Sequence, residues 1–223
     1  MERLLHLFER YPLDFFSSFS SGLPLLIGLF RYKYLSATLK PLLLLFLLYF
    51  VGETYSIWLA LLRQNNLFVL NFYPIGGIAL IGYMYALNFD SRALKRLLLY
   101  SAGLFSCLCI ALFEWNSVSS PALFVYKTYI IFVVLLHFNK IISDLRVRNI
   151  LVHTLFWVNA GLIMYASGTM FISLFSDTIF NPAIVDDDTF DKYWNINNIL
   201  FIILTILTSI GIWFSKYDRE NLL

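Results

Sequence analysis

Residues 51–83 read VGETYSIWLALLRQNNLFVLNFYPIGGIALIGY, and this stretch decides the fold. It contains the end of one apolar run, a short polar break at residues 63–66, and the start of the next apolar run. Glu53 lies inside the first run, Asn71 lies inside the second, and PIGG follows at residues 74–77. Ionisable and amide side chains are costly within lipid-length segments and need partners. The rest of the chain must therefore supply those partners.

The composition of the chain is that of a membrane protein. Of its 223 residues, 60% are hydrophobic and 13% are charged, whereas soluble domains have about 45–50% apolar and about 25% charged residues. Several apolar runs reach the roughly 17–25 residues that a helix needs to cross a bilayer. We predict an all-α integral membrane protein, a seven-transmembrane-helix bundle. Its expected partner is the lipid bilayer that surrounds it. Residues 1–10 are amphipathic, so we expect no cleavable signal peptide.

Seven apolar runs are long enough to be spans. They cover residues 13–30, 41–62, 67–88, 97–113, 121–138, 150–175 and 193–214. Residues 1–12 are then an amphipathic N-terminal segment, residues 13–214 are the transmembrane domain, and residues 215–223 are a short cytoplasmic tail. Pro24 lies inside the first span, and proline removes a helix hydrogen bond, so we expect a kink there.

The basic residues alternate between the two ends of this predicted bundle. If the N-terminus is outside, eleven Lys and Arg residues fall in inner connections or the tail, and four fall in outer segments. The inner ones are Arg31, Lys33, Lys40, Arg92, Lys95, Arg96, Lys140, Arg146, Arg148, Lys216 and Arg219, and the outer ones are Arg3, Arg10, Arg63 and Lys192. Cytoplasmic loops carry the excess of Lys and Arg. This distribution predicts an outside N-terminus and a cytoplasmic C-terminus.

Polar residues within the spans concentrate in the outer half of the predicted bundle. Glu53 and Lys127 lie at similar depths, Lys127 about two turns into its span at 1.5 Å per residue. We predict that these two side chains come within contact range or share a ligand. The candidate pocket residues are Glu53, Asn71, Glu114, Tyr126, Lys127 and Asn198. Two other interpretations stay open: a Glu53–Lys127 pair that only holds helices together, and an unpaired Lys127 that reaches the lipid interface.

Motifs of catalysis and cofactor binding are absent from the sequence. His6, His137 and His153 do not fall at the spacing of metal ligands on a helix. Cys107 and Cys109 are two apart in an apolar run, so they face different sides of one helix and suit neither a disulfide nor a metal site. The seventh span has no interior lysine, which excludes retinal chemistry of the heptahelical type. We expect no enzyme activity, cofactor, metal or nucleic-acid partner.

Residues 65–74, NNLFVLNFYP, followed by an apolar helix, resemble a recurring pattern in small seven-span bacterial membrane proteins. In those proteins an N-N loop precedes a span that begins with His or Asn, then an apolar residue and Tyr. Residues 194–198 and 211–213 look similar to their last helix, so the resemblance covers most of the chain. It implies the bacterial inner membrane and, because such proteins are often encoded beside sensor kinases, signalling. The chain departs at Asn71, where many relatives have His, and at residues 75–77, where many carry an acidic residue.

Two classes of function follow. The first is a receptor-like sensory or accessory signalling subunit that binds a small or lipid-like molecule in its outer half. It would shift its helices about a hinge at Pro74, Gly76 and Gly77 and act on a membrane or cytoplasmic partner through the basic inner loops. The alternative is a small transporter or channel, which needs internal repeat symmetry and a polar path to both faces. An assembly subunit without a ligand is a third interpretation, and the oligomeric state stays open.

Overall fold

The computed structural model describes residues 2–144, 149–179, 181 and 183–218. Within these residues the chain forms helices and short connections. The elements are α1 (Glu2–Arg10), α2 (Pro12–Ser20), α3 (Gly22–Phe30), η1 (Tyr32–Tyr34), α4 (Lys40–Leu61), η2 (Leu67–Asn71), α5 (Phe72–Asn88), α6 (Arg92–Ala111), α7 (Ser120–Asp144), η3 (Ile150–Val152), α8 (Thr154–Leu174), α9 (Ser176–Ile179) and α10 (Asp187–Phe214), where η marks a 3₁₀ helix.

Seven segments of the described chain are long and apolar enough to cross a membrane, as predicted. They are Pro12–Phe30, Lys40–Leu61, Leu67–Asn88, Arg92–Ala111, Ser120–Ser143, Thr154–Leu174 and Asp188–Phe214. The chain is therefore an all-helical protein with the features of a multi-pass membrane protein. The predicted N-terminal segment is a separate helix, α1. The predicted tail is described as far as Asp218, and residues 219–223 lie outside the described residues.

Three helices extend into connections that hydropathy predicted to be loops. The helix α6 begins at Arg92, where the Oγ of Ser91 accepts a hydrogen bond from the Leu94 backbone N–H. The helix α7 continues to Asp144, and α10 begins at Asp187, before the predicted start of the seventh span at residue 193. Terminal turns of a membrane helix reach the polar headgroup region, which lies beyond the roughly 30 Å hydrocarbon core. Hydropathy alone therefore predicts these helices to be shorter than they are.

The first span is divided into two helices close to Pro24, where a kink was predicted. The break falls at Ser21, between α2 and α3, and Pro24 lies in the first turn of α3. Because proline has no N–H, the carbonyl of Ser20 lacks its usual helical donor there. The third span is also divided: the 3₁₀ helix η2 comes first, and Pro74 lies in the first turn of α5.

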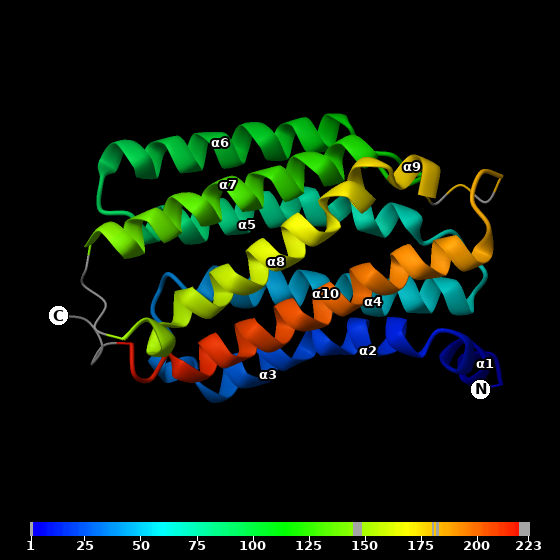
Figure 1. The fold of residues 1–223 in the computed structure, drawn as a ribbon, viewed down its shortest axis with the longest axis horizontal. Helices are drawn as coiled ribbons and strands as arrows, with labels where there is room; N and C mark the ends of the chain where they lie inside the picture. The colour runs from blue at the N-terminus through cyan, green and yellow to red at the C-terminus, as the bar shows by residue number, and fades with distance from the viewer. Residues whose placement is uncertain (1, 145–148, 180, 182, 219–223) are drawn as a thin grey trace.

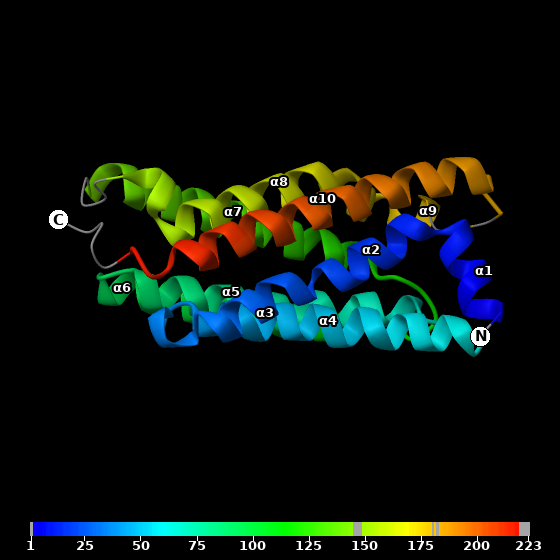
Figure 2. The same cartoon turned by 90° about the horizontal axis from the view of Figure 1, so that it is seen from below.

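Six of the seven spans form a closed ring within the described chain, and α6 lies outside it (Figures 1 and 2). Contacts run from α4 through α5, α7, α8 and α10, and return to α4 through α2 and α3. The helix α6 packs mainly against α5. We call the end of the bundle that holds α1, α9 and the α6–α7 connection the α1 end.

The middle of the ring is an apolar layer. Ile78, Ile130, Val133, Leu162 and Leu204 are each 0% exposed, and they come from α5, α7, α8 and α10. Side chains in such a layer touch partners on all sides and leave few voids large enough for water. This layer separates the α1 end of the bundle from the opposite end.

Two of the predicted hinge residues, Gly76 and Gly77, lie where α5 closely approaches its neighbours. A Cβ on Gly76 would lie 2.6 Å from a Leu48 methyl, and a Cβ on Gly77 would lie 2.5 Å from the Tyr126 hydroxyl. Only glycine leaves room for these side chains at such separations. The two glycines therefore let α4 and α7 contact α5, while motion about Pro74 stays a prediction.

Candidate functional site

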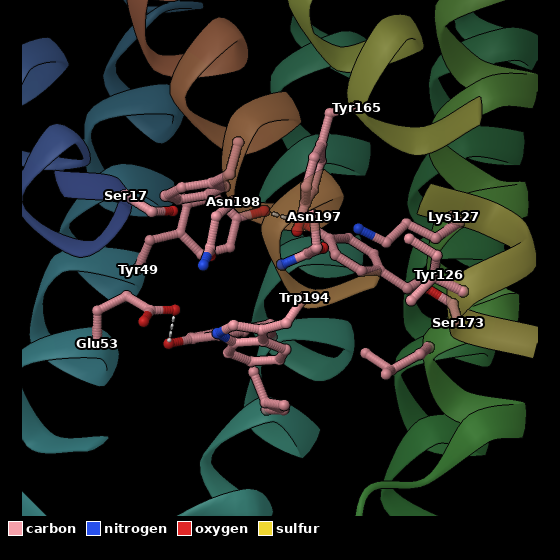
Figure 3. Close-up of a pocket in the computed structure, with 15 residues that line it drawn as sticks. Ser17, Tyr49, Glu53, Tyr126, Lys127, Tyr165, Ser173, Trp194, Asn197 and Asn198 are labelled. Carbon is pink, nitrogen blue, oxygen red and sulfur yellow. Dashed lines mark hydrogen bonds between the residues drawn. The ribbon is translucent and has the colours of Figure 1, made fainter. Parts of the chain in front are cut away.

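A cavity of about 60 Å³ lies in the half of the bundle near the α1 end (Figure 3). Its lining residues are Ser17, Tyr49, Glu53, Leu70, Tyr73, Leu123, Tyr126, Lys127, Tyr165, Ile172, Ser173, Trp194, Asn197, Asn198 and Phe201. Four of the predicted pocket residues, Glu53, Tyr126, Lys127 and Asn198, are in this lining. They come from α4, α7 and α10, which the ring brings together. We call this space the lysine cavity.

Lys127 is buried in this cavity, and none of the described residues offers its ammonium an acceptor. It is 3% exposed, and its Nζ lies 3.4 Å from the centroid of the Tyr165 ring. It makes no hydrogen bond or ion pair to the part of the chain that the structure describes. A desolvated cation–π contact contributes about 2 kcal/mol or more, but removing an ammonium from water costs several kcal/mol. The ring contact therefore offsets only part of the desolvation cost.

Glu53 does not pair with Lys127, although both line the lysine cavity. Its carboxylate accepts hydrogen bonds from the Tyr73 hydroxyl at 2.9 Å and the Ser18 hydroxyl at 3.1 Å. In Figure 3 the carboxylate and the ammonium lie on opposite sides of the cavity, with Tyr126 on the Lys127 side. The predicted direct contact is absent between these two described residues: the Glu53 carboxylate bonds two hydroxyls, and the Lys127 ammonium lies over the Tyr165 ring. What remains of the prediction is a shared cavity.

Aromatic side chains build a stiff wall around the lysine cavity. The hydroxyls of Tyr49 and Tyr126 form a hydrogen bond to each other. The Tyr49 ring meets the Tyr73 ring edge-on at 5.2 Å and the Phe201 ring at 5.3 Å, and Phe201 meets Tyr165 at 5.6 Å. Edge-to-face aromatic pairs contribute about 0.5–1.5 kcal/mol beyond their buried area. The cavity shape is therefore largely preformed.

A second cavity of about 200 Å³ adjoins the first and shares Glu53, Leu70 and Trp194 with it. Its lining residues are Leu7, Tyr11, Asp14, Phe15, Glu53, Ser56, Ile57, Ala60, Asn66, Leu67, Leu70, Phe190 and Trp194. Asp14 was not among the predicted site residues. Its Oδ1 accepts hydrogen bonds from Trp194 Nε1 at 2.9 Å and from Asn198 Nδ2 at 3.4 Å. An acid two residues into a predicted membrane helix was the sequence signal for it. We call this space the acidic cavity.

Asn71 and Glu114 belong to a different cluster, at the α6–α7 connection. The Asn71 amide donates to the backbone carbonyls of Glu114 at 2.6 Å and Ser117 at 2.9 Å, and its Oδ1 accepts from the Ser119 N–H at 2.8 Å. Its side chain is 0% exposed. Glu114 is exposed, and its carboxylate accepts from the Ser117 hydroxyl. Both N–H donors of the Asn71 amide and one of its acceptor positions are thus used by the α6–α7 connection. Asn71 lines neither of the two cavities.

Toward the opposite end of the bundle, a buried polar network links three helices. The Tyr85 hydroxyl donates to Asn159 Oδ1 at 2.5 Å, and Asn159 Nδ2 contacts His137 Nδ1 at 2.9 Å. At most 3% of each residue is exposed. Fully satisfied buried networks hold helices in one arrangement. Within the described chain, no group of three or more His, Cys, Asp or Glu side chains could hold a metal ion.

No protein-family model, curated protein or solved structure matches the chain. The resemblance carried by residues 65–74 therefore stays a prediction.

Proposed function

We propose that the chain is a receptor-like sensory or accessory signalling subunit of the bacterial inner membrane, with its N-terminus outside. It binds a small molecule in the adjoining lysine and acidic cavities. The observation that carries this proposal is the Lys127 ammonium, which is buried beside a cavity and makes no hydrogen bond or ion pair to the described chain. Ionisable groups at membrane depth are costly and mark functional sites by default.

The apolar layer supports a receptor over a transporter or channel. Conduction or transport needs a polar path to both faces of the membrane. Between the cavities and the end of the bundle opposite the α1 end, the ring is filled by side chains such as Ile78, Val133 and Leu204, which are 0% exposed. The Tyr85–Asn159–His137 network adds a polar cross-link beyond them. An apolar layer next to a ligand cavity is suited to a protein that senses occupancy rather than one that conducts.

Contacts between the lysine cavity and α5 offer a route for the signal. Tyr126 lines the cavity and lies against Gly77 of α5, so a ligand that displaces this ring changes the spacing of α5 and α7. Pro74 lies in the first turn of α5, beside its junction with η2, where the two helices would tilt relative to each other. The far ends of these helices carry the basic connections predicted to face the cytoplasm, where a signalling partner would bind.

The test is native mass spectrometry of the protein extracted from its own membranes in mild detergent. Wild-type protein should carry a small molecule, and Lys127→Met should lower its occupancy at least tenfold. The control is Lys33→Met, which removes an exposed lysine of η1. Without ligand, the Lys127→Met protein should be about 1–4 kcal/mol more stable to unfolding than ligand-free wild type, because an apolar group replaces a buried charge. Empty wild-type protein, or equal occupancy in Lys127→Met, would contradict the proposal.

A further inference from the structure

We infer that the ligand is a small zwitterion whose ammonium lies toward Asp14 and Glu53 and whose carboxylate lies toward Lys127. This inference rests on the proposed function and names the class of molecule bound. It is carried by the distribution of charge over the two cavities: Asp14 and Glu53 line the acidic cavity, and Lys127 lines the lysine cavity across from Glu53, which borders both spaces.

The acidic cavity has the groups that bind an ammonium. A carboxylate offers about four acceptor positions. Asp14 uses its Oδ1 for Trp194 and Asn198, and Glu53 accepts from two hydroxyls, so positions remain on both groups. The Trp194 indole stands in the same wall, and aromatic faces attract ligand ammonium groups. The Arg3 guanidinium also lies near this cavity, because its Nη2 donates a hydrogen bond of 2.7 Å to the carbonyl of Ala60, a lining residue.

The lysine cavity has the group that binds a carboxylate. The Lys127 ammonium carries three N–H donors, and it makes no hydrogen bond or ion pair to the described residues. Its Nζ lies over the Tyr165 ring on the far side of the cavity from Glu53 (Figure 3). A ligand carboxylate would supply the missing acceptor. Asn198, in the same lining, could donate a further hydrogen bond.

A ligand with only one charge satisfies the charged groups of only one of the two adjoining cavities. An amine would pair with Glu53 and leave the Lys127 ammonium without an acceptor. A carboxylate would pair with Lys127 but share the lysine cavity with the Glu53 carboxylate. Burying an unpaired charge costs several kcal/mol. A molecule that carries both charges avoids both penalties.

The cavity volumes limit the size of the ligand. The lysine cavity encloses about 60 Å³, and a water molecule needs roughly 10–15 Å³ measured in this way. This is room for a carboxylate and its neighbouring carbon atoms. The acidic cavity, at about 200 Å³, takes the rest. Leu70 and Trp194 line both spaces, so a slender chain between the two charges fits best.

The test is a binding panel on the full chain in lipid nanodiscs, measured by Trp194-dependent fluorescence and by calorimetry. Each zwitterion is compared with a carboxylate and an amine of matched length: glycine with acetate and methylamine, 4-aminobutyrate with butyrate and butylamine, 6-aminohexanoate with hexanoate and hexylamine. At least one zwitterion should bind tenfold or more tightly than both of its analogues. Lys127→Met should reduce this affinity to that of the amine, and Asp14→Asn should reduce it toward that of the acid. Lys33→Met should bind like wild type.

The outcomes separate this inference from the proposed function. An analogue that binds as tightly as its zwitterion overturns the inference and leaves ligand binding intact. If the panel does not bind, the molecule that co-purifies decides: one with an amine and an acid supports the inference, and one without both overturns it. If nothing binds and nothing co-purifies, the proposed function is wrong as well.

Discussion

Replacing Asn71 by alanine should destabilise the protein by about 3 kcal/mol, because the side chain holds the α6–α7 connection rather than a ligand. Three hydrogen bonds are lost, to the carbonyls of Glu114 and Ser117 and from the Ser119 N–H. Each contributes about 0.5–1.5 kcal/mol net, and a buried group left unpaired costs about 1–3 kcal/mol. Asn71 is 0% exposed and Ser119 is 1% exposed, so water replaces these bonds poorly.

The assay is reversible unfolding in mixed micelles, with two further variants. Asn71→Asp keeps the acceptor for the Ser119 N–H but places a carboxylate oxygen against two carbonyl oxygens, so it should be at least as destabilising as alanine. The matched control is Asn65→Ala. Asn65 also bonds the α6–α7 connection, at 3.1 Å to the Asn116 carbonyl, but it is exposed. Its loss should stay within about 0.5 kcal/mol. An Asn71→Ala loss this small, or wild-type stability of Asn71→Asp, would refute the reasoning.

Two further variants test the packing around the cavities. Gly77→Ala should lower stability by about 1–3 kcal/mol because its Cβ meets the Tyr126 ring, whereas Gly103→Ala, with nothing within 4 Å, should be neutral or stabilise by up to about 1 kcal/mol. Thermal denaturation in detergent compares the two, and equal melting temperatures would contradict the close contact. Asn159→Ala should cost about 1–3 kcal/mol by leaving His137 Nδ1 unpaired. Lost ligand occupancy at unchanged stability would argue against its structural role.

The depth of a side chain along the bundle was predictable from the sequence. The neighbour toward which that side chain points was not. Glu53 and Lys127 were expected at one depth, and both do line one cavity. Depth follows from the count of residues between a span's end and the side chain. The side of the cavity on which each group stands depends on how every helix is rotated in the ring. The direct pair, which required matching rotations, is for that reason absent between these two described residues.

Asn71 and Asp14 also show that depth does not predict contacts: one was expected in the pocket and lies outside it, and the other was not expected and lies in a cavity. Asn71 was expected to reach a ligand, but its partners are backbone groups of the α6–α7 connection, 43 to 48 residues away in the chain. Asp14 was left out of the expected pocket, yet it shares the acidic cavity with Glu53. Its hydrogen-bond partners, Trp194 and Asn198, are 180 and 184 residues distant. Sequence patterns within one span carry no information about such contacts.

The sequence by itself determined the helical class, the number of apolar spans and the interruption of the first span near Pro24, because these depend on local chemistry. Apolar run length sets how many helices can cross a bilayer, and a missing N–H breaks a helix wherever proline falls inside it. Only the tertiary structure decided that α6 lies outside the ring, that two cavities adjoin, and that Lys127 faces Tyr165 rather than Glu53. Those features follow from helix packing, in which distant side chains must fit one another at once.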